Sequence, residues 1–218
     1  WIDICGSWGD PPMNKDLIKM VEWIVKNNKS TFISIQTNGS LRDEKFWYDL
    51  GYKGGKQLSV HFAVEGINQE MHEKYRQKTY LKKILNNMNT LSNTKARIYT
   101  QTLVWKHNED YLDEIEKLCV DHGSTSHREV YTDRRFDKNN RWIFTDPKGN
   151  LNYLEKSIPN IDENVSTLEN TSYGFKEKIR RQDQEDETKL WKLGNQILDE
   201  KDKRKISCKW GNVNRILV

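Results

Sequence analysis

Hydrophobic positions in the first two thirds of the chain follow two alternating spacings. Nearly continuous or alternating runs of hydrophobic residues predict β-strands over residues 1–6, 30–39, 57–66, 96–105 and 127–133. Between them, hydrophobic residues three and four positions apart predict helices over residues 14–28, 43–54, 80–93 and 111–123. Strands that alternate with helices through long connections form parallel sheets, so we expect an α/β fold built from stacked β-α units.

The pattern changes after about residue 136. Residues 136–150 are mostly polar and end in a Pro-Lys-Gly-Asn turn, and residues 155–175 are rich in Asn, Ser and Thr, so we expect a linker there. The segment 175–205 fits a helix with mixed charges, which we interpret as a solvated face rather than a partner surface. We therefore divide the chain into residues 1–135, a linker and helical region over 136–205, and a new segment over 206–218.

Composition and charge narrow the possible functions. The 218 residues carry a formal net charge of +4, with acidic and basic residues interspersed, which is too small a bias to indicate nucleic-acid binding. There is no signal peptide and no long apolar run, so we expect a cytoplasmic protein that does not enter a membrane. Three cysteines lie far apart and form no CxxC pair, and we interpret Cys5 and Cys119 as core residues.

The ends of the predicted strands carry residues that are unusual for purely structural segments. They are Gly6 to Pro11, Gln36 to Gly39, Ala63 to Gly66, and Gln101 with Thr102. Because chemistry in β/α folds gathers at the carboxyl ends of parallel strands, we expect one shared site at this edge. In such a site the Gly-Asp-Pro turn would offer main-chain N–H groups and the Asp10 carboxylate to a small polar ligand. Taken alone, the same turn is better explained as a rigid loop entering a helix.

Four motifs, in this order, resemble those of the radical SAM superfamily. They are CGSWGDPPMNKDLIKMVEWI, ISIQTNGSLRDEKFWYDL, VHFAVEGINQEMHEKYR and RIYTQTLVWKHNEDYLDEI. The resemblance covers residues 1–135 and is closest to the branch in which a SPASM or twitch extension follows the barrel. It implies a partial, open (β/α) barrel of parallel strands that lacks its first strand, with a mixed C-terminal extension. The ISCKW segment at 206–210 resembles the start of a SPASM-type extension.

The resemblance also implies a set of residues that bind S-adenosylmethionine. The turn formed by Gly9, Asp10 and Pro11 would lie beside the methionyl amine. Thr37 and Asn38 would face the cofactor from the end of the next strand.

Later motifs extend this implied set and depart from it in part. Ala63 stands where the family usually has Ser, and Glu65 stands where it has Asp. Arg76, which follows His72 and Tyr75, would pair with the cofactor carboxylate in a bidentate contact. Gln101 and Asn108 are further candidates; we interpret His72 either as part of this motif or as a surface capping residue.

One departure from the family is larger than these. The defining CxxxCxxC loop, whose thiolates hold the [4Fe–4S] cluster at which the cofactor is cleaved to a 5′-deoxyadenosyl radical, is absent from this sequence. We therefore expect no cluster in the chain as given. We interpret the chain as an internal fragment whose cluster ligands would precede Trp1 in a longer parent. Cys208 would be an auxiliary-cluster ligand in that parent.

The implied function is hydrogen abstraction from a peptide or small-molecule substrate, with an electron donor such as a flavodoxin or ferredoxin as partner. Catalytic residues are not identified. Two alternatives stay open: a non-catalytic, barrel-derived binding module, and an ordinary α/β enzyme that binds a phosphate or sugar. The latter favours a GxGxxG or GxxxxGK[ST] loop, and neither occurs in the sequence.

Overall fold

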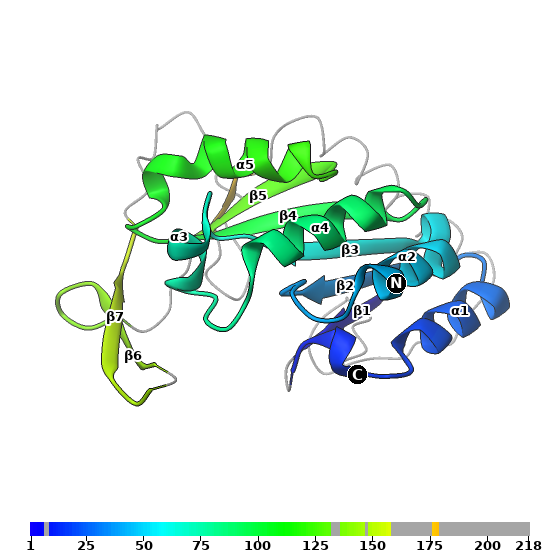
Figure 1. Ribbon diagram of the computed structural model, residues 1–218, viewed down its shortest axis with the longest axis horizontal. Coiled ribbons are helices and arrows are strands. Elements are labelled where there is room, and N and C mark those ends of the chain that lie inside the picture. Colours follow the sequence, from blue (N-terminus) through cyan, green and yellow to red (C-terminus); the bar gives the residue numbers. More distant parts are fainter. Residues whose placement is uncertain (7–8, 132–135, 147, 158–175, 179–218) are drawn as a thin grey trace, which may run out of the picture.

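A computed structural model describes residues 1–6, 9–131, 136–146, 148–157 and 176–178 of the chain (Figure 1). Its main sheet has six strands in the order β1-β2-β3-β4-β5-β8, of which the first five are parallel. The five parallel strands are β1 (Ile2–Cys5), β2 (Ile33–Thr37), β3 (Leu58–Ala63), β4 (Arg97–Val104) and β5 (Ser126–Tyr131). The helices are α1 (Leu17–Asn27), α2 (Glu44–Gly54), α3 (Gln69–Glu73), α4 (Leu81–Ser92) and α5 (Leu112–Asp121). The predicted α/β class and the parallel sheet are thereby confirmed.

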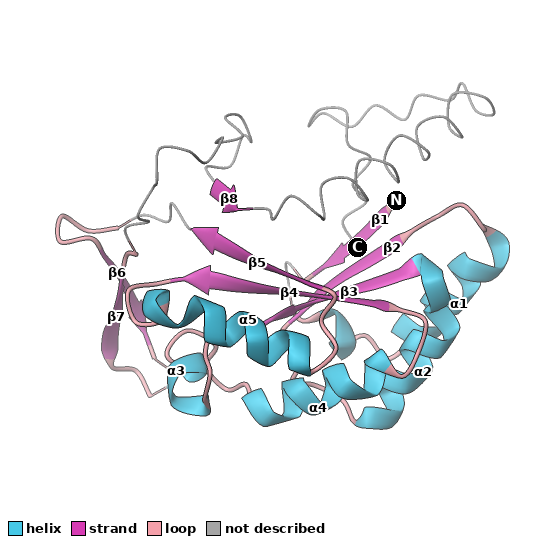
Figure 2. Cartoon of the chain, turned by 90° about the horizontal axis from the view of Figure 1, so that it is seen from above, coloured by secondary structure: helices cyan, strands magenta, loops and turns pink. Residues whose placement is uncertain are grey.

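All the described helices lie on one face of this sheet (Figure 2). The order of the parallel strands follows the chain without reversal. Since parallel crossovers are right-handed, a sheet that never reverses its strand order receives every crossover helix on the same side. A doubly wound sheet reverses its order and carries helices on both faces. The winding is therefore that of a β/α barrel, while the curvature of a partial barrel stays a prediction.

The hydrophobic core lies between the sheet and these helices. One register row across the sheet joins Ile4, Ile35, Val60 and Ile98, all buried. Trp47 of α2 is also fully buried and packs on Phe62 of β3, with ring centroids 5.2 Å apart. The nearly continuous apolar runs in the sequence come from strands whose inner face is covered in this way.

The opposite face of the sheet is polar. The neighbouring register row joins Cys5, Gln36, His61 and Tyr99, and each of these side chains is half-buried. The rings of His61 and Tyr99 lie 4.9 Å apart. Apolar residues on one face and polar residues on the other leave a surface that a polar ligand can use.

Our prediction of a linker over residues 136–150 is wrong. The described residues there form an antiparallel hairpin of β6 (Arg141–Thr145) and β7 (Leu151–Glu155). Asp146 closes the turn by accepting hydrogen bonds from the main-chain N–H groups of Lys148 and Asn150. In both views the hairpin lies beyond the carboxyl ends of β4 and β5, beside α3 (Figures 1 and 2).

The C-terminal expectations can be followed only in part. Our prediction of a helix over residues 175–205 is wrong for Lys176–Lys178. These residues form strand β8, which pairs antiparallel with β5. The rest of that segment and the proposed extension at 206–218, with Cys208, lie outside the described residues. Among the described helices, none has the length and hydrophobicity that crossing a membrane would require.

Candidate functional site

Asp10 reaches from the first strand end to the second. The chain leaves β1 through Gly6, where a Cβ would lie 1.7 Å from the main-chain oxygen of Gly9, so only glycine fits this tight turn. Asp10 then precedes a 3₁₀ turn over Pro11–Met13 whose two prolines are buried. Its carboxylate accepts a hydrogen bond from the Thr37 hydroxyl at 2.6 Å and one from the Asn38 main-chain N–H at 3.2 Å.

The Thr-Asn-Gly turn at the end of β2 is fixed from several sides. The Thr37 hydroxyl accepts a hydrogen bond from the Gly39 N–H at 2.9 Å while it donates to Asp10. Gly39 has a φ of +73°, and a Cβ there would meet the Phe62 ring at 2.4 Å. The buried amide of Asn87 donates to the Gly39 carbonyl at 2.8 Å. This leaves Asn38 at the tip of the turn, half-buried.

Arg76 joins the second strand end to the third. Its Nε donates to Oε1 of Glu65 at 3.0 Å, and a terminal nitrogen lies 3.0 Å from the same oxygen. The other terminal nitrogen donates to Oδ1 of Asn38 at 2.8 Å. Glu65 itself is fully buried, just beyond the end of β3. Together, Asp10, Thr37, Asn38, Arg76 and Glu65 form one hydrogen-bonded set, hereafter the strand-end network.

His72 fixes the loop between Glu65 and Arg76 through hydrogen bonds at both of its ring nitrogens. Its Nδ1 accepts the main-chain N–H of Glu65 at 3.1 Å, which assigns the ring hydrogen to Nε2. Nε2 therefore donates to the Thr79 hydroxyl at 2.9 Å, and that hydroxyl donates to the Arg76 carbonyl at 2.6 Å. His72 is fully buried, so its interpretation as a surface capping residue is wrong. Burial, with the charge of Arg76, lowers the pKa of His72 to about 4, which keeps the ring neutral.

Asn108 braces the same loop from the turn that follows β4. Its amide nitrogen donates to the carbonyls of Glu65 and Leu103, both at 3.1 Å, and its oxygen accepts the Trp105 N–H at 2.8 Å. The side chain is fully buried. The structure therefore places Asn108 as a brace behind Glu65.

The strand-end network holds more acidic than basic groups. Asp10 and Glu65 are carboxylic acids, Arg76 is its one base, and His72 beneath it is neutral. Burial raises the pKa of Asp10, opposed by hydrogen bonds from Thr37 and Asn38. Burial likewise raises the pKa of Glu65, opposed by Arg76 and, to a smaller extent, by the main-chain N–H of Leu103. Within the described part of the chain, Oε2 of Glu65 is buried with no hydrogen-bond partner of normal geometry. Such a set is stabilised by a ligand that brings positive charge.

The remaining predicted residues lie near the network but outside it. Gly9 and Pro11 flank Asp10 in its turn. Ala63 is buried and pairs in register with Gln101 on the polar face of the sheet. The Gln101 side-chain oxygen accepts two hydrogen bonds from Arg128, at 2.7 and 3.2 Å. The expected convergence of Asp10, Thr37 and Glu65 at one edge is therefore seen, but a role of any of these residues in cofactor binding stays a prediction.

The described residues do not fit an iron–sulfur cluster. No group of three or more His, Cys, Asp or Glu side chains in the described ranges is arranged to hold a metal. Cys119 is a fully buried residue of α5, where burial raises the pKa of its thiol to about 12. Cys5 lies apart on β1 and is half-buried, so its interpretation as a core residue is wrong. A cubane cluster needs three or four converging thiolates, so no step of the chemistry is assigned to a cluster here.

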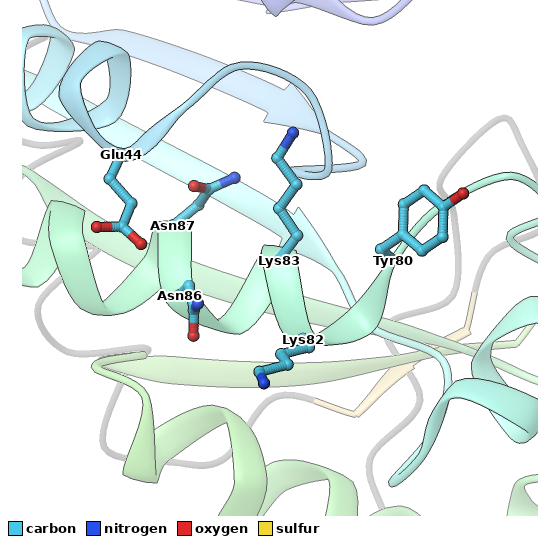
Figure 3. Close-up of a pocket in the computed structure, with 6 residues that line it drawn as sticks. All are labelled: Glu44, Tyr80, Lys82, Lys83, Asn86 and Asn87. Atoms are coloured by element: carbon cyan, nitrogen blue, oxygen red, sulfur yellow. The ribbon is translucent and has the colours of Figure 1, made fainter.

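Two hollows of about 380 Å³ each open on the described surface. The first lies on α4, with Glu44 contributed by α2, and the side chains of Lys82 and Lys83 point away from each other (Figure 3). It offers no converging groups. The second adjoins the strand-end network and is lined by Asn38, Tyr75, Arg76, Gln77, Thr79, Trp142, Phe144 and Thr145.

Sequence reasoning missed the aromatic part of this second hollow. Trp142 and Phe144 come from β6, in the segment that we interpreted as a linker. The signal was present as two short runs on either side of an Asp-Pro-Lys-Gly-Asn turn, the pattern of a hairpin.

Comparisons with known proteins do not assign this chain to a family. No protein-family model matches the chain, and no curated protein matches it. Among solved structures, the chain is similar to a crystal structure of archaeal TYW1, with a TM-score of 0.44 and 13% identity over 71% of this chain. The match covers 56% of that protein, so the chain spans little more than half its length.

Proposed function

We propose that the strand-end network binds S-adenosylmethionine and that the chain is part of a radical SAM enzyme. The observation that carries the proposal is the network itself: residues from three motifs, distant in sequence, share one set of hydrogen bonds at the carboxyl edge of the sheet. The motif resemblance expects the cofactor at that edge. The strand order, which never reverses, is the winding that a partial barrel of this family requires.

Charge supports this choice of ligand. Asp10 and Glu65 outnumber Arg76, and burial makes their negative charge costly. The ligand carries an ammonium and a sulfonium, and either cation would offset this imbalance. In this proposal the ammonium lies beside Asp10, where a charged hydrogen bond forms.

Arg76 is the proposed partner of the ligand's carboxylate. A guanidinium has five N–H donors. Its contacts with Glu65 and Asn38 occupy three of them among the described residues. The remaining N–H groups can donate to a ligand carboxylate without breaking the ion pair with Glu65.

The reaction class is part of the proposal. When bound to a [4Fe–4S] cluster, the cofactor supplies a radical that abstracts hydrogen from a substrate. The described residues provide the binding edge, and the cluster and its electron donor, such as a flavodoxin or ferredoxin, would come from elsewhere. We propose a peptide or small molecule as substrate and a cytoplasmic setting. The proposal extends to the superfamily; a SPASM-type extension rests on residues outside the described ranges.

Binding of S-adenosylmethionine by the 218-residue chain, measured by isothermal titration calorimetry, tests the proposal. Asp10→Asn removes the charge and keeps the shape of the side chain. Because a hydrogen bond to a charged group contributes about 1.5–3 kcal/mol, we expect affinity to fall about tenfold to a hundredfold. Asp16→Asn is the matched control, since Asp16 is exposed and pairs only locally with Lys19. It should bind as the unmodified chain does.

S-adenosylhomocysteine provides a second comparison, because it lacks the sulfonium charge. We expect it to bind more weakly than S-adenosylmethionine if the network favours a cation. A chain that binds neither compound, or an Asp10→Asn variant that binds S-adenosylmethionine as tightly as the unmodified chain, would contradict the proposal. The Gly-Asp-Pro segment would then be a rigid turn and no more.

A further inference from the structure

The hollow beside the strand-end network has one aromatic wall and one polar wall. Tyr75, Trp142 and Phe144 form the aromatic wall, and the side chains of Asn38, Gln77 and Thr79 contribute polar groups. Its volume of about 380 Å³ is at the small end of the range for ligand pockets, which suits a single ring better than an extended molecule.

The aromatic wall is an ordered stack. The rings of Trp142 and Phe144 lie 5.1 Å apart at an angle of 23°, and those of Trp142 and Trp105 lie 5.6 Å apart at 26°. Trp105 is fully buried at the end of β4, so it anchors the stack in the main domain. Rings held in place by their neighbours lose little entropy when another ring packs on them.

The two faces of the hairpin lie in different surroundings. Trp142 and Phe144 alternate along β6 with Ile143, which is 53% exposed. Tyr153, the register partner of Ile143 on β7, is also 53% exposed. One side of the hairpin therefore presents Trp142 and Phe144 to the hollow, and the other presents Ile143 and Tyr153 to solvent.

The polar wall has little net charge. Among the described residues that line the hollow, Arg76 is the one that carries a charge, and it is paired with the buried Glu65. Nucleotides and nucleic acids are recognised through basic groups that meet their phosphates, and the described part of the chain brings no second basic residue to this hollow. The amides and hydroxyls instead suit a neutral ring with a polar edge, such as a phenol or an indole.

We propose that this hollow holds the side chain of a tyrosine or tryptophan residue of a peptide substrate. The ring stacks on the Trp142–Phe144 wall, and its hydroxyl or N–H bonds to the amides of Asn38 and Gln77. Asn38 and Arg76 belong both to the hollow and to the strand-end network. The bound residue therefore lies next to the proposed cofactor site. This assignment rests on the proposed function and names the substrate class.

The test measures binding of N-acetyl-L-tyrosinamide and N-acetyl-L-tryptophanamide to the 218-residue chain by calorimetry, without S-adenosylmethionine. N-acetyl-L-leucinamide and adenosine are the comparison ligands. Phe144→Leu removes a ring that faces the hollow, and Tyr153→Leu removes a ring from the opposite side of the same hairpin. We expect the aromatic amides to bind best, about tenfold more weakly to Phe144→Leu, and unchanged to Tyr153→Leu. Circular dichroism and melting temperature confirm that both variants fold.

Several results would overturn the assignment: no binding of either aromatic amide, equal weakening by both variants, or tighter binding of adenosine, which would make the hollow a nucleobase site. Titrating the aromatic amides into the chain in saturating S-adenosylmethionine gives one further result that would overturn the assignment. If the cofactor displaces the aromatic amides, the hollow belongs to the cofactor itself. Binding of the amides by a chain that does not bind S-adenosylmethionine would leave the aromatic site standing and overturn the proposed function alone.

Discussion

The two faces of the parallel sheet differ in what they are built to contact. The face under the helices carries Ile35, Val60 and Phe62, each fully buried. The other face carries Gln36 and His61, each one residue further along the same strands and half-buried. Strands of an ordinary parallel sheet are apolar on both faces, because helices cover both. A sheet that is apolar on one side and polar on the other is adapted to hold a polar ligand on its second side.

Both faces end at the same edge, and there the distinction disappears. Thr37 is buried on the helix-covered side, yet its hydroxyl binds Asp10. Glu65 is buried as deeply as the core but is charged when ionised. Two members of the strand-end network are therefore polar groups buried as deeply as the core, an environment in which a bound cation is strongly stabilised.

Core truncation should have the largest effect on stability. Phe62→Ala removes a ring that packs on Trp47 and against the Gly39 turn, so we expect a loss of about 3–5 kcal/mol in the free energy of unfolding. Gln36→Ala, on the adjacent strand but the polar face, should cost less than about 0.5 kcal/mol. Urea denaturation measures both. Equal losses from the two variants would show that the faces do not differ in packing.

The fold of residues 1–131 could be predicted from the sequence because its signals are local. Apolar runs gave each parallel strand to within a few residues, and helical spacing located the four long helices. The five-residue α3 and the hairpin were missed. A short helix has too few turns to show a period, and the five residues of β6 stand among charged and polar neighbours that masked their alternation.

The site could be predicted only as a location. Parallel strands bring their carboxyl ends to one edge, so the convergence of Asp10, Thr37 and Glu65 follows from the strand order. The pairing of Arg76 with Glu65 and Asn38 does not, because it depends on how the loop after β3 folds back. The conformation of this loop is set by His72, and no local sequence pattern predicts that His72 is buried.

The dependence of stability on pH should show whether the polar face is shielded from water or is an ordinary solvent-exposed surface. Burial, reinforced by Arg128 and opposed by Asp3, lowers the pKa of His61 from its ordinary value of 6.5 to about 4. Below pH 6.5 the unfolded chain takes up a proton that folded His61 refuses, so stability is full above that pH and is lost as pH falls toward 4. With partial solvent screening, we expect a loss of about 1–2 kcal/mol at pH 5 from this residue.

The variant His61→Gln isolates this contribution. Its unfolding free energy should fall less between pH 7.5 and pH 5 than that of the unmodified chain. His72→Gln should flatten the same profile, because burial also lowers the pKa of His72 to about 4. If His72→Gln flattens the profile and His61→Gln does not, the polar face is open to water. The contrast between the two faces would then rest only on the types of residue that each face carries.

The smallest expected effect concerns the hydroxyl at which the two faces meet. Thr37→Val keeps the shape of the side chain but removes the donor to Asp10 and the acceptor for the Gly39 N–H. A buried main-chain N–H left without a partner costs about 1–3 kcal/mol, and partial access of water to the turn places our expectation near the lower value. Thr90→Val is the control, since its hydroxyl bonds only to a carbonyl within α4. Losing one donor should also raise the pKa of Asp10 further and weaken S-adenosylmethionine binding in the proposed function. A Thr37→Val chain with unchanged stability and affinity would show that Asp10 is positioned by its own turn, and that the link between the first two strand ends contributes nothing.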